Sequence, residues 1–104
     1  MIIISDTSPI SNLLQINHLW LLKELYQEII IPPAVQRELY AIAIQEEKIG
    51  VLDWIKVVAP TNQKLILELT ADLDLGESES IALALEFKAD YLIIDEYLGR
   101  TIAQ

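Results

Sequence analysis

The sequence predicts an α/β fold with a central, mostly parallel sheet. Short, continuous apolar runs are typical of strands buried on both faces, and amphipathic segments with helical spacing alternate with those runs along the chain. The chain has 104 residues, 53% of them hydrophobic, with only three Gly and four Pro. We therefore expect one globular domain spanning residues 1–104.

The first strand and the first helical region are predicted from the amino-terminal end. Met1 to Ile4 is an apolar, β-branched run that favours a buried strand. Thr7 or Ser8, followed by a proline, marks a helix start, and leucines continue at helical spacing beyond it. Asn17 is a plausible cap for a second helix in this region.

A second strand and another helix are predicted next. Glu28 to Ile31 is rich in isoleucine and ends at Pro32, while Pro33 suits the first turn of a helix. Gly50 breaks that helix. The apolar positions that recur at helical spacing in it are Val35, Leu39, Ile42 and Ala43.

The second half of the chain is predicted to hold two more strands and two strong helices. The strands are Trp54 to Ala59 and Tyr91 to Ile94. The helices are Leu65 to Leu73 and Glu77 to Lys88, joined by a turn in the segment LDLGES. A last helical segment begins at Gly99.

Composition and charge disfavour several classes of protein. The net charge of −9 argues against a protein that holds nucleic acid mainly through a basic surface, and it suits a basic protein partner. The absence of cysteine excludes disulfides and thiolate metal sites. No apolar run approaches the roughly 20 residues needed to span a bilayer, and no basic segment precedes a signal-like run. We expect a cytoplasmic protein with no membrane association.

Four acidic residues occupy related positions along the chain. Asp6 and Asp95 follow predicted strands, Glu38 lies about one and a half turns into a helix, and Glu77 lies in the first turn of another. Taken singly, such residues are commonly helix caps or partners of the helix dipole. Because the carboxyl ends of parallel strands share one edge of a sheet, we expect the four to meet there, where carboxylates suit a hard divalent cation.

Four segments together resemble the PIN domain family of metal-dependent ribonucleases, in particular its VapC-like branch. They are DTSPISNL, IPPAVQREL, LGESESIALALE and LIIDEYLGRTIA, which occur in the family's order and spacing. The resemblance runs from residue 1 to about residue 103. It implies a three-layer α/β/α domain with Mg²⁺ or Mn²⁺ held by a carboxylate quartet. The family normally continues with a further strand and helix, which we expect this chain to lack.

The resemblance assigns the quartet by position. The ligands and catalytic residues it implies are Asp6, Glu38, Glu77 and Asp95. Glu79 is the alternative third ligand, but it lies about 200° further around the helix than Glu77. Hydroxyls of Thr7 or Ser8 and the amide of Asn12 are expected to orient the first carboxylate or to contact substrate.

The implied activity is hydrolysis of RNA phosphodiester bonds by the toxin half of a toxin–antitoxin pair. Carboxylate-bound Mg²⁺ or Mn²⁺ makes water more acidic and stabilises charge on the phosphate and the leaving oxygen. A cognate antitoxin would cover the pocket. Loss of the last strand and helix would expose a sheet edge, so a homodimer is also expected.

Two other functions compete with this one. A phosphatase of the haloacid dehalogenase type also starts with a strand ending in Asp, but it needs a second Asp two residues later, where this chain has Ser8. The stronger alternative is a truncated or degenerate PIN-like domain that binds metal or protein without catalysis.

Several other chemically capable residues are predicted to lie outside the site. His18 is the only histidine, so a histidine-based mechanism has little to draw on. Arg37 and Arg100 neighbour proposed ligands and could steady a phosphate, but solvated surface positions suit them equally. Trp20 and Trp54 are expected in the core or an interface.

Overall fold

A computed structural model describes residues 1–41 and 52–94 and contains a four-stranded sheet in the order β3-β2-β1-β4. Every neighbouring pair of strands is parallel. The predicted α/β class is therefore confirmed, with a sheet that is wholly parallel in the described residues. The strands are β1 (Ile3–Ser5), β2 (Ile29–Ile31), β3 (Ile55–Val57) and β4 (Tyr91–Ile93).

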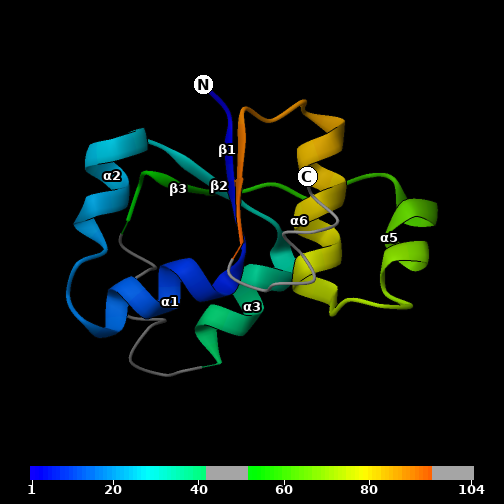
Figure 1. The fold of residues 1–104 in the computed structure, drawn as a ribbon, viewed down its shortest axis with the longest axis horizontal. Coiled ribbons are helices and arrows are strands. Elements are labelled where there is room, and N and C mark those ends of the chain that lie inside the picture. The colour runs from blue at the N-terminus through cyan, green and yellow to red at the C-terminus, as the bar shows by residue number, and fades with distance from the viewer. Residues whose placement is uncertain (42–51, 95–104) are drawn as a thin grey trace.

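Helices flank this sheet on both sides. Figure 1 shows α1 and α2 on one side of β1 and β4, α5 and α6 on the other, and α3 crossing below. None of the helices in the described residues is long and apolar enough to cross a membrane. The helices are α1 (Thr7–Gln15), α2 (Trp20–Tyr26), α3 (Pro33–Tyr40), α5 (Gln63–Leu69) and α6 (Leu75–Glu86).

The two central strands, β1 and β2, are buried on both faces, which explains why their sequences are almost continuously apolar. Ile3, Ile29 and Ile31 join one buried cluster with leucines of α1 and α2 and with Trp54. Ile4 alternates with Ile3 and is also fully buried, while α6 contacts both β1 and β4. Two helical layers therefore enclose the sheet.

The register of the neighbouring strands β1 and β4 brings their carboxyl ends together. Ser5 lies opposite Ile93, and the backbone N–H of Asp6 donates to the Ile93 carbonyl at 2.9 Å. The carboxyl ends of β1, β2 and β4 meet at one edge, where α1, α3 and α6 begin or pass. We refer to this edge as the carboxyl edge.

The first helices begin one or more residues away from the predicted positions. Asp6, and not Thr7 or Ser8, is the N-cap of α1. Asn17 caps no helix, because α2 begins at Trp20; instead Asn17 takes a left-handed φ of 59° in the turn that ends α1. Asparagine tolerates this conformation better than most residues.

The segment LDLGES was predicted as a turn, and this is wrong for its last four residues. Helix α6 already begins at Leu75, because the Asp74 side chain accepts a hydrogen bond from the Glu77 N–H and caps the first turn. Helix α5 spans Gln63–Leu69, with Asn62 as its capping residue, so the predicted Leu65 to Leu73 was shifted. The predicted features at Ile42, Ala43, Gly50 and Gly99 lie outside the described residues.

Candidate metal centre at the carboxyl edge

Asp6 ends β1 as a buried carboxylate. It is only 4% exposed. It occupies the N-cap position of α1, with φ −80° and ψ 178°, yet its side chain makes no capping hydrogen bond to that helix. The local interpretation of Asp6 as a helix cap therefore does not account for the position of its carboxylate.

Glu38 brings a second carboxylate to the same place. It lies in the second turn of α3, and its carboxyl group packs over Gly76 at the start of α6. A Cβ built on Gly76 would overlap Glu38 Oε1, and it would lie 3.5 Å from Asp6 Oδ1. Two acids that are 32 positions apart in sequence thus meet beside one glycine.

The surroundings of Glu38 disfavour its charged form. Although the side chain as a whole is exposed, packing of its tip raises the pKa above the ordinary value of 4.5, mainly through desolvation. The Asp74 carboxylate raises this pKa further by repulsion, whereas the Thr7 hydroxyl and the Arg37 guanidinium lower it. Among the described residues, desolvation and repulsion by Asp74 therefore outweigh the hydroxyl of Thr7 and the positive charge of Arg37.

Thr7 lies between the strand end and Glu38. Its hydroxyl oxygen is buried and has no well-formed hydrogen bond in the described residues, although it approaches Glu38 closely enough to lower that pKa. A buried hydroxyl with spare bonding capacity is available to orient a neighbouring carboxylate or a bound water. Of the three neighbours predicted from sequence, Ser8 is partly buried and Asn12 is exposed.

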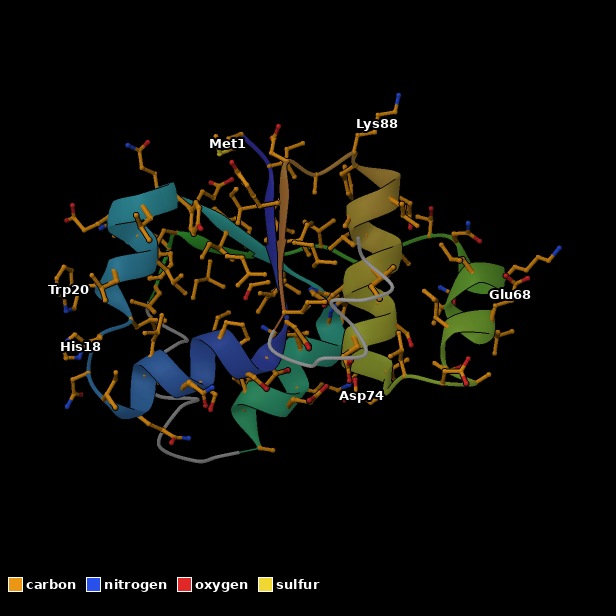
Figure 2. All side chains as sticks on the ribbon, in the orientation of Figure 1. Met1, His18, Trp20, Glu68, Asp74 and Lys88 are labelled. Atoms are coloured by element: carbon orange, nitrogen blue, oxygen red, sulfur yellow. The ribbon has the colours of Figure 1, made fainter. Side chains whose placement is uncertain are left out.

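The start of α6 carries the third proposed ligand and an acid that the sequence interpretation missed. Glu77 is buried, with 7% of its surface exposed, and its backbone N–H donates to Asp74 Oδ1 at 2.8 Å. Asp74 is exposed, and Figure 2 shows it at the end of α6 that faces α3. The pattern Asp-x-x-Glu before an apolar helix, present at 74–77, could have revealed this cap.

Glu79, the alternative third ligand, makes a hydrogen bond between α6 and α3. Its Oε1 accepts a hydrogen bond at 3.0 Å from the backbone N–H of Ala34, in the first turn of α3. A carboxylate at that position satisfies a donor that the helix itself leaves unpaired and complements the helix dipole. This bond gives the Glu79 carboxylate a structural contact, while the choice between Glu77 and Glu79 as third ligand stays a prediction.

Asp95 lies outside the described residues. Strand β4 leads toward it, since the chain through Ile94 reaches the carboxyl edge beside Asp6. The placement of the fourth proposed ligand therefore stays a prediction, as do the roles of the other three.

The donors at this edge fit a hard cation in kind. Asp6 and Glu38 supply carboxylate oxygens, which Mg²⁺ and Mn²⁺ prefer. Within residues 1–41 and 52–94, no group of three or more His, Cys, Asp or Glu side chains is arranged to hold a metal ion. The described part of the chain thus contributes a converging pair of carboxylates.

The residues set aside from the site lie apart from it. His18 and Trp20 are exposed and stack on each other with ring centroids 6.2 Å apart, on the side of the molecule remote from Asp74 (Figure 2). Trp20 was expected in the core or an interface, and it is not in the core, being 56% exposed. Trp54 is buried in the main cluster as expected, and Arg37 is exposed.

Comparison with known proteins supports one family. A family model described as a PIN domain matches residues 2–104, nearly the whole chain. No curated protein and no solved structure gives a significant match. The match agrees with the parallel sheet and with the motif resemblance, while the VapC-like branch stays a prediction.

Proposed function

Because the chain belongs to the PIN-domain family, whose members are generally nucleases and typically use divalent metals, we propose that it is a Mg²⁺- or Mn²⁺-dependent ribonuclease. The proposed ligands are Asp6, Glu38, Glu77 and Asp95. The proposed substrate is RNA, cleaved by hydrolysis of its phosphodiester bonds.

One observation carries this proposal. The carboxylates of Asp6 and Glu38 converge beside Gly76, and the Asp6 side chain makes no capping hydrogen bond to its own helix. Converging carboxylates repel each other, and desolvation and then the Asp74 carboxylate already raise the pKa of Glu38, so its surroundings disfavour negative charge. A bound cation reverses this penalty, so a metal site is a physical reason for the arrangement.

In this proposal some residues bind the metal ion, and others orient its ligands or the substrate. Asp6 and Glu38 would hold the ion beside Gly76, and Glu77 would add a ligand from the first turn of α6. The Thr7 hydroxyl, with Ser8 and Asn12 nearby, would orient Asp6 or a substrate oxygen. When bound, the metal ion makes an attacking water more acidic and stabilises charge on the scissile phosphate.

The biological setting that fits this chemistry is a toxin of the VapC-like branch, acting in the cytoplasm and restrained by an antitoxin. A net charge of −9 supports recognition by a basic protein segment, and an Arg side chain inserted at the carboxyl edge could pair with Asp6 and Glu38. A homodimer is part of the same proposal. It is supported by β4, an edge strand of the described sheet that carries Tyr91 at 55% exposure.

The test is cleavage of a structured RNA by the purified chain with Mn²⁺ or Mg²⁺. We expect the wild-type protein to cleave it and Asp6→Asn to leave it intact. Glu68→Gln is the matched control, because Glu68 lies exposed on α5 away from the carboxyl edge (Figure 2), and it should cleave like wild type. Equal cleavage by wild type and Asp6→Asn would reject the proposed site.

A non-catalytic binding module is the second candidate. It is favoured by the fact that only two of the proposed carboxylates converge within residues 1–41 and 52–94. Wild-type protein that binds Mn²⁺ but leaves every RNA intact would support this alternative over the ribonuclease.

A further inference from the structure

The backbone conformation at Gly76 does not require glycine. It is the second residue of α6, and no glycine in the described residues has a positive φ. Alanine is the stronger helix former at such a position. The presence of glycine therefore needs an explanation outside the helix itself.

The explanation lies in the approach of Glu38 to the helix. A Cβ on residue 76 would overlap Glu38 Oε1 and lie 3.2 Å from the Glu38 carboxyl carbon. The same Cβ would lie 3.5 Å from Asp6 Oδ1, which is ordinary van der Waals contact. A methyl group here would thus displace the Glu38 carboxylate and spare Asp6.

Glu79 makes a second contact between α3 and α6, this time from α6 to the start of α3. While Glu38 of α3 reaches the start of α6, Glu79 of α6 accepts the hydrogen bond from Ala34 N at the start of α3. Ala34 lies one turn before Glu38, on the same face of α3, and is buried. Fixing the first turn of α3 therefore fixes the base from which the Glu38 side chain extends.

We propose that Gly76 and Glu79 are positioning residues that hold the Glu38 carboxylate beside Asp6. The inference rests on the proposed function, since it takes Glu38 and Asp6 to be metal ligands. Gly76 acts by leaving room for the carboxylate, and Glu79 acts by anchoring the helix that carries it. Neither residue contacts the ion in this account.

The first test is Gly76→Ala, measured as Mn²⁺ affinity by calorimetry. We expect the dissociation constant to rise about 10-fold or more, as for other residues that orient metal ligands. The melting temperature of the metal-free protein should change little, because the displaced group is the far end of a flexible side chain. An unchanged Mn²⁺ affinity would overturn the role of Gly76.

The control is the same substitution in a protein whose Glu38 side chain is already removed. In the Glu38→Ala background, Gly76→Ala should cause no further loss of Mn²⁺ affinity, because the carboxylate that it displaces is absent. A similar loss in both backgrounds would show that Gly76 acts through something other than Glu38, and would contradict the inference.

Glu79 is tested by a conservative pair of variants. Glu79→Gln keeps an oxygen that can accept from Ala34 N, so it should bind Mn²⁺ within roughly threefold of wild type, whereas Glu79→Ala should lose about 10-fold. Equal losses in Glu79→Gln and Glu79→Ala would mean that the charge itself matters. Glu79 would then be a ligand and not a positioning residue.

A measurement without metal or RNA separates failure of this inference from failure of the proposed function. The ¹³C resonance of the Glu38 carboxyl carbon should move in metal-free Gly76→Ala. If this resonance moves but the wild-type protein cleaves no RNA, the nuclease is rejected and the role of Gly76 in placing Glu38 is supported. An unmoved resonance would overturn the positioning role even if RNA is cleaved.

Discussion

Asp6 and Asp74 occupy the same local position and use it differently. Each is the N-cap of a helix, with φ and ψ of −80° and 178° for Asp6 and −73° and 171° for Asp74. Asp74 is exposed and accepts a hydrogen bond from its own helix, whereas Asp6 is buried and makes no capping bond. Equal backbone geometry therefore does not decide what a carboxylate does; the neighbouring side chains do.

Substitutions at Asp74 and at Asp6 should therefore have different effects. Asp74 stabilises α6 at a point where the helix is short of acceptors. The Asp6 carboxylate lies beside that of Glu38, at the site proposed for the cation. We therefore expect substitutions at Asp74 to affect folding and substitutions at Asp6 to affect metal binding.

The largest expected effect is that of Asp6→Asn on metal affinity. Losing an anionic ligand should weaken Mn²⁺ binding by more than the roughly 10- to 100-fold typical of residues that only orient ligands. Asp74→Asn keeps its capping oxygen and should change the affinity much less. Titration calorimetry of both variants checks this, and the comparison fails if Asp74→Asn weakens binding as much as Asp6→Asn.

An intermediate effect is expected for Asp74→Ala on stability. Loss of a capping oxygen costs about 1 kcal/mol, which corresponds to roughly 4–8 °C in melting temperature for a domain of this size. Asp74→Asn should melt close to wild type, because asparagine also caps. Thermal unfolding followed by circular dichroism measures both variants, and a similar loss in the two would mean that charge and not the hydrogen bond matters at this position.

The smallest expected effect is a pH-dependent change in Glu38→Gln. Because desolvation and Asp74 raise the pKa of folded Glu38 above 4.5, the folded state favours the protonated form. The carboxyl group therefore becomes destabilising as the pH rises from about 4.5 through the folded pKa.

In metal-free protein, Glu38→Gln should accordingly melt a few degrees above wild type at pH 7 and at the same temperature as wild type near pH 3. Thermal melts across this range provide the measurement. A destabilised variant at pH 7 would show that the protein itself already compensates the charge of the Glu38 carboxylate, and would weaken the case for a metal site.

The features that sequence could predict are those set by short-range patterns. The continuous isoleucine runs predicted the buried strands, and the order of strands and helices predicted the parallel sheet that places Asp6 at the carboxyl edge. The start of α6 was also predictable in principle, since Asp74 and Glu77 form a capping pattern, but the adjacent glycine made the segment resemble a turn.

The contacts between α3 and α6 could not be predicted in this way. The need for glycine at position 76 arises from a side chain 38 positions earlier, and the bond between Glu79 and Ala34 spans 45 positions. Helical spacing predicts which face of a helix a residue occupies, but it does not predict which side chain of another helix will pack against that residue. Such contacts follow from the packing of two helices, which only the folded chain determines.

The most direct test of the metal site is the melting temperature of the wild-type chain with and without Mn²⁺. If Asp6 and Glu38 hold the ion, Mn²⁺ at 100 times its dissociation constant should add about 2.7 kcal/mol to the free energy of unfolding, a rise of roughly 10 °C or more. Asp6→Asn should show little of this rise. A wild-type melting temperature that does not change in millimolar Mn²⁺ or Mg²⁺ would contradict the account.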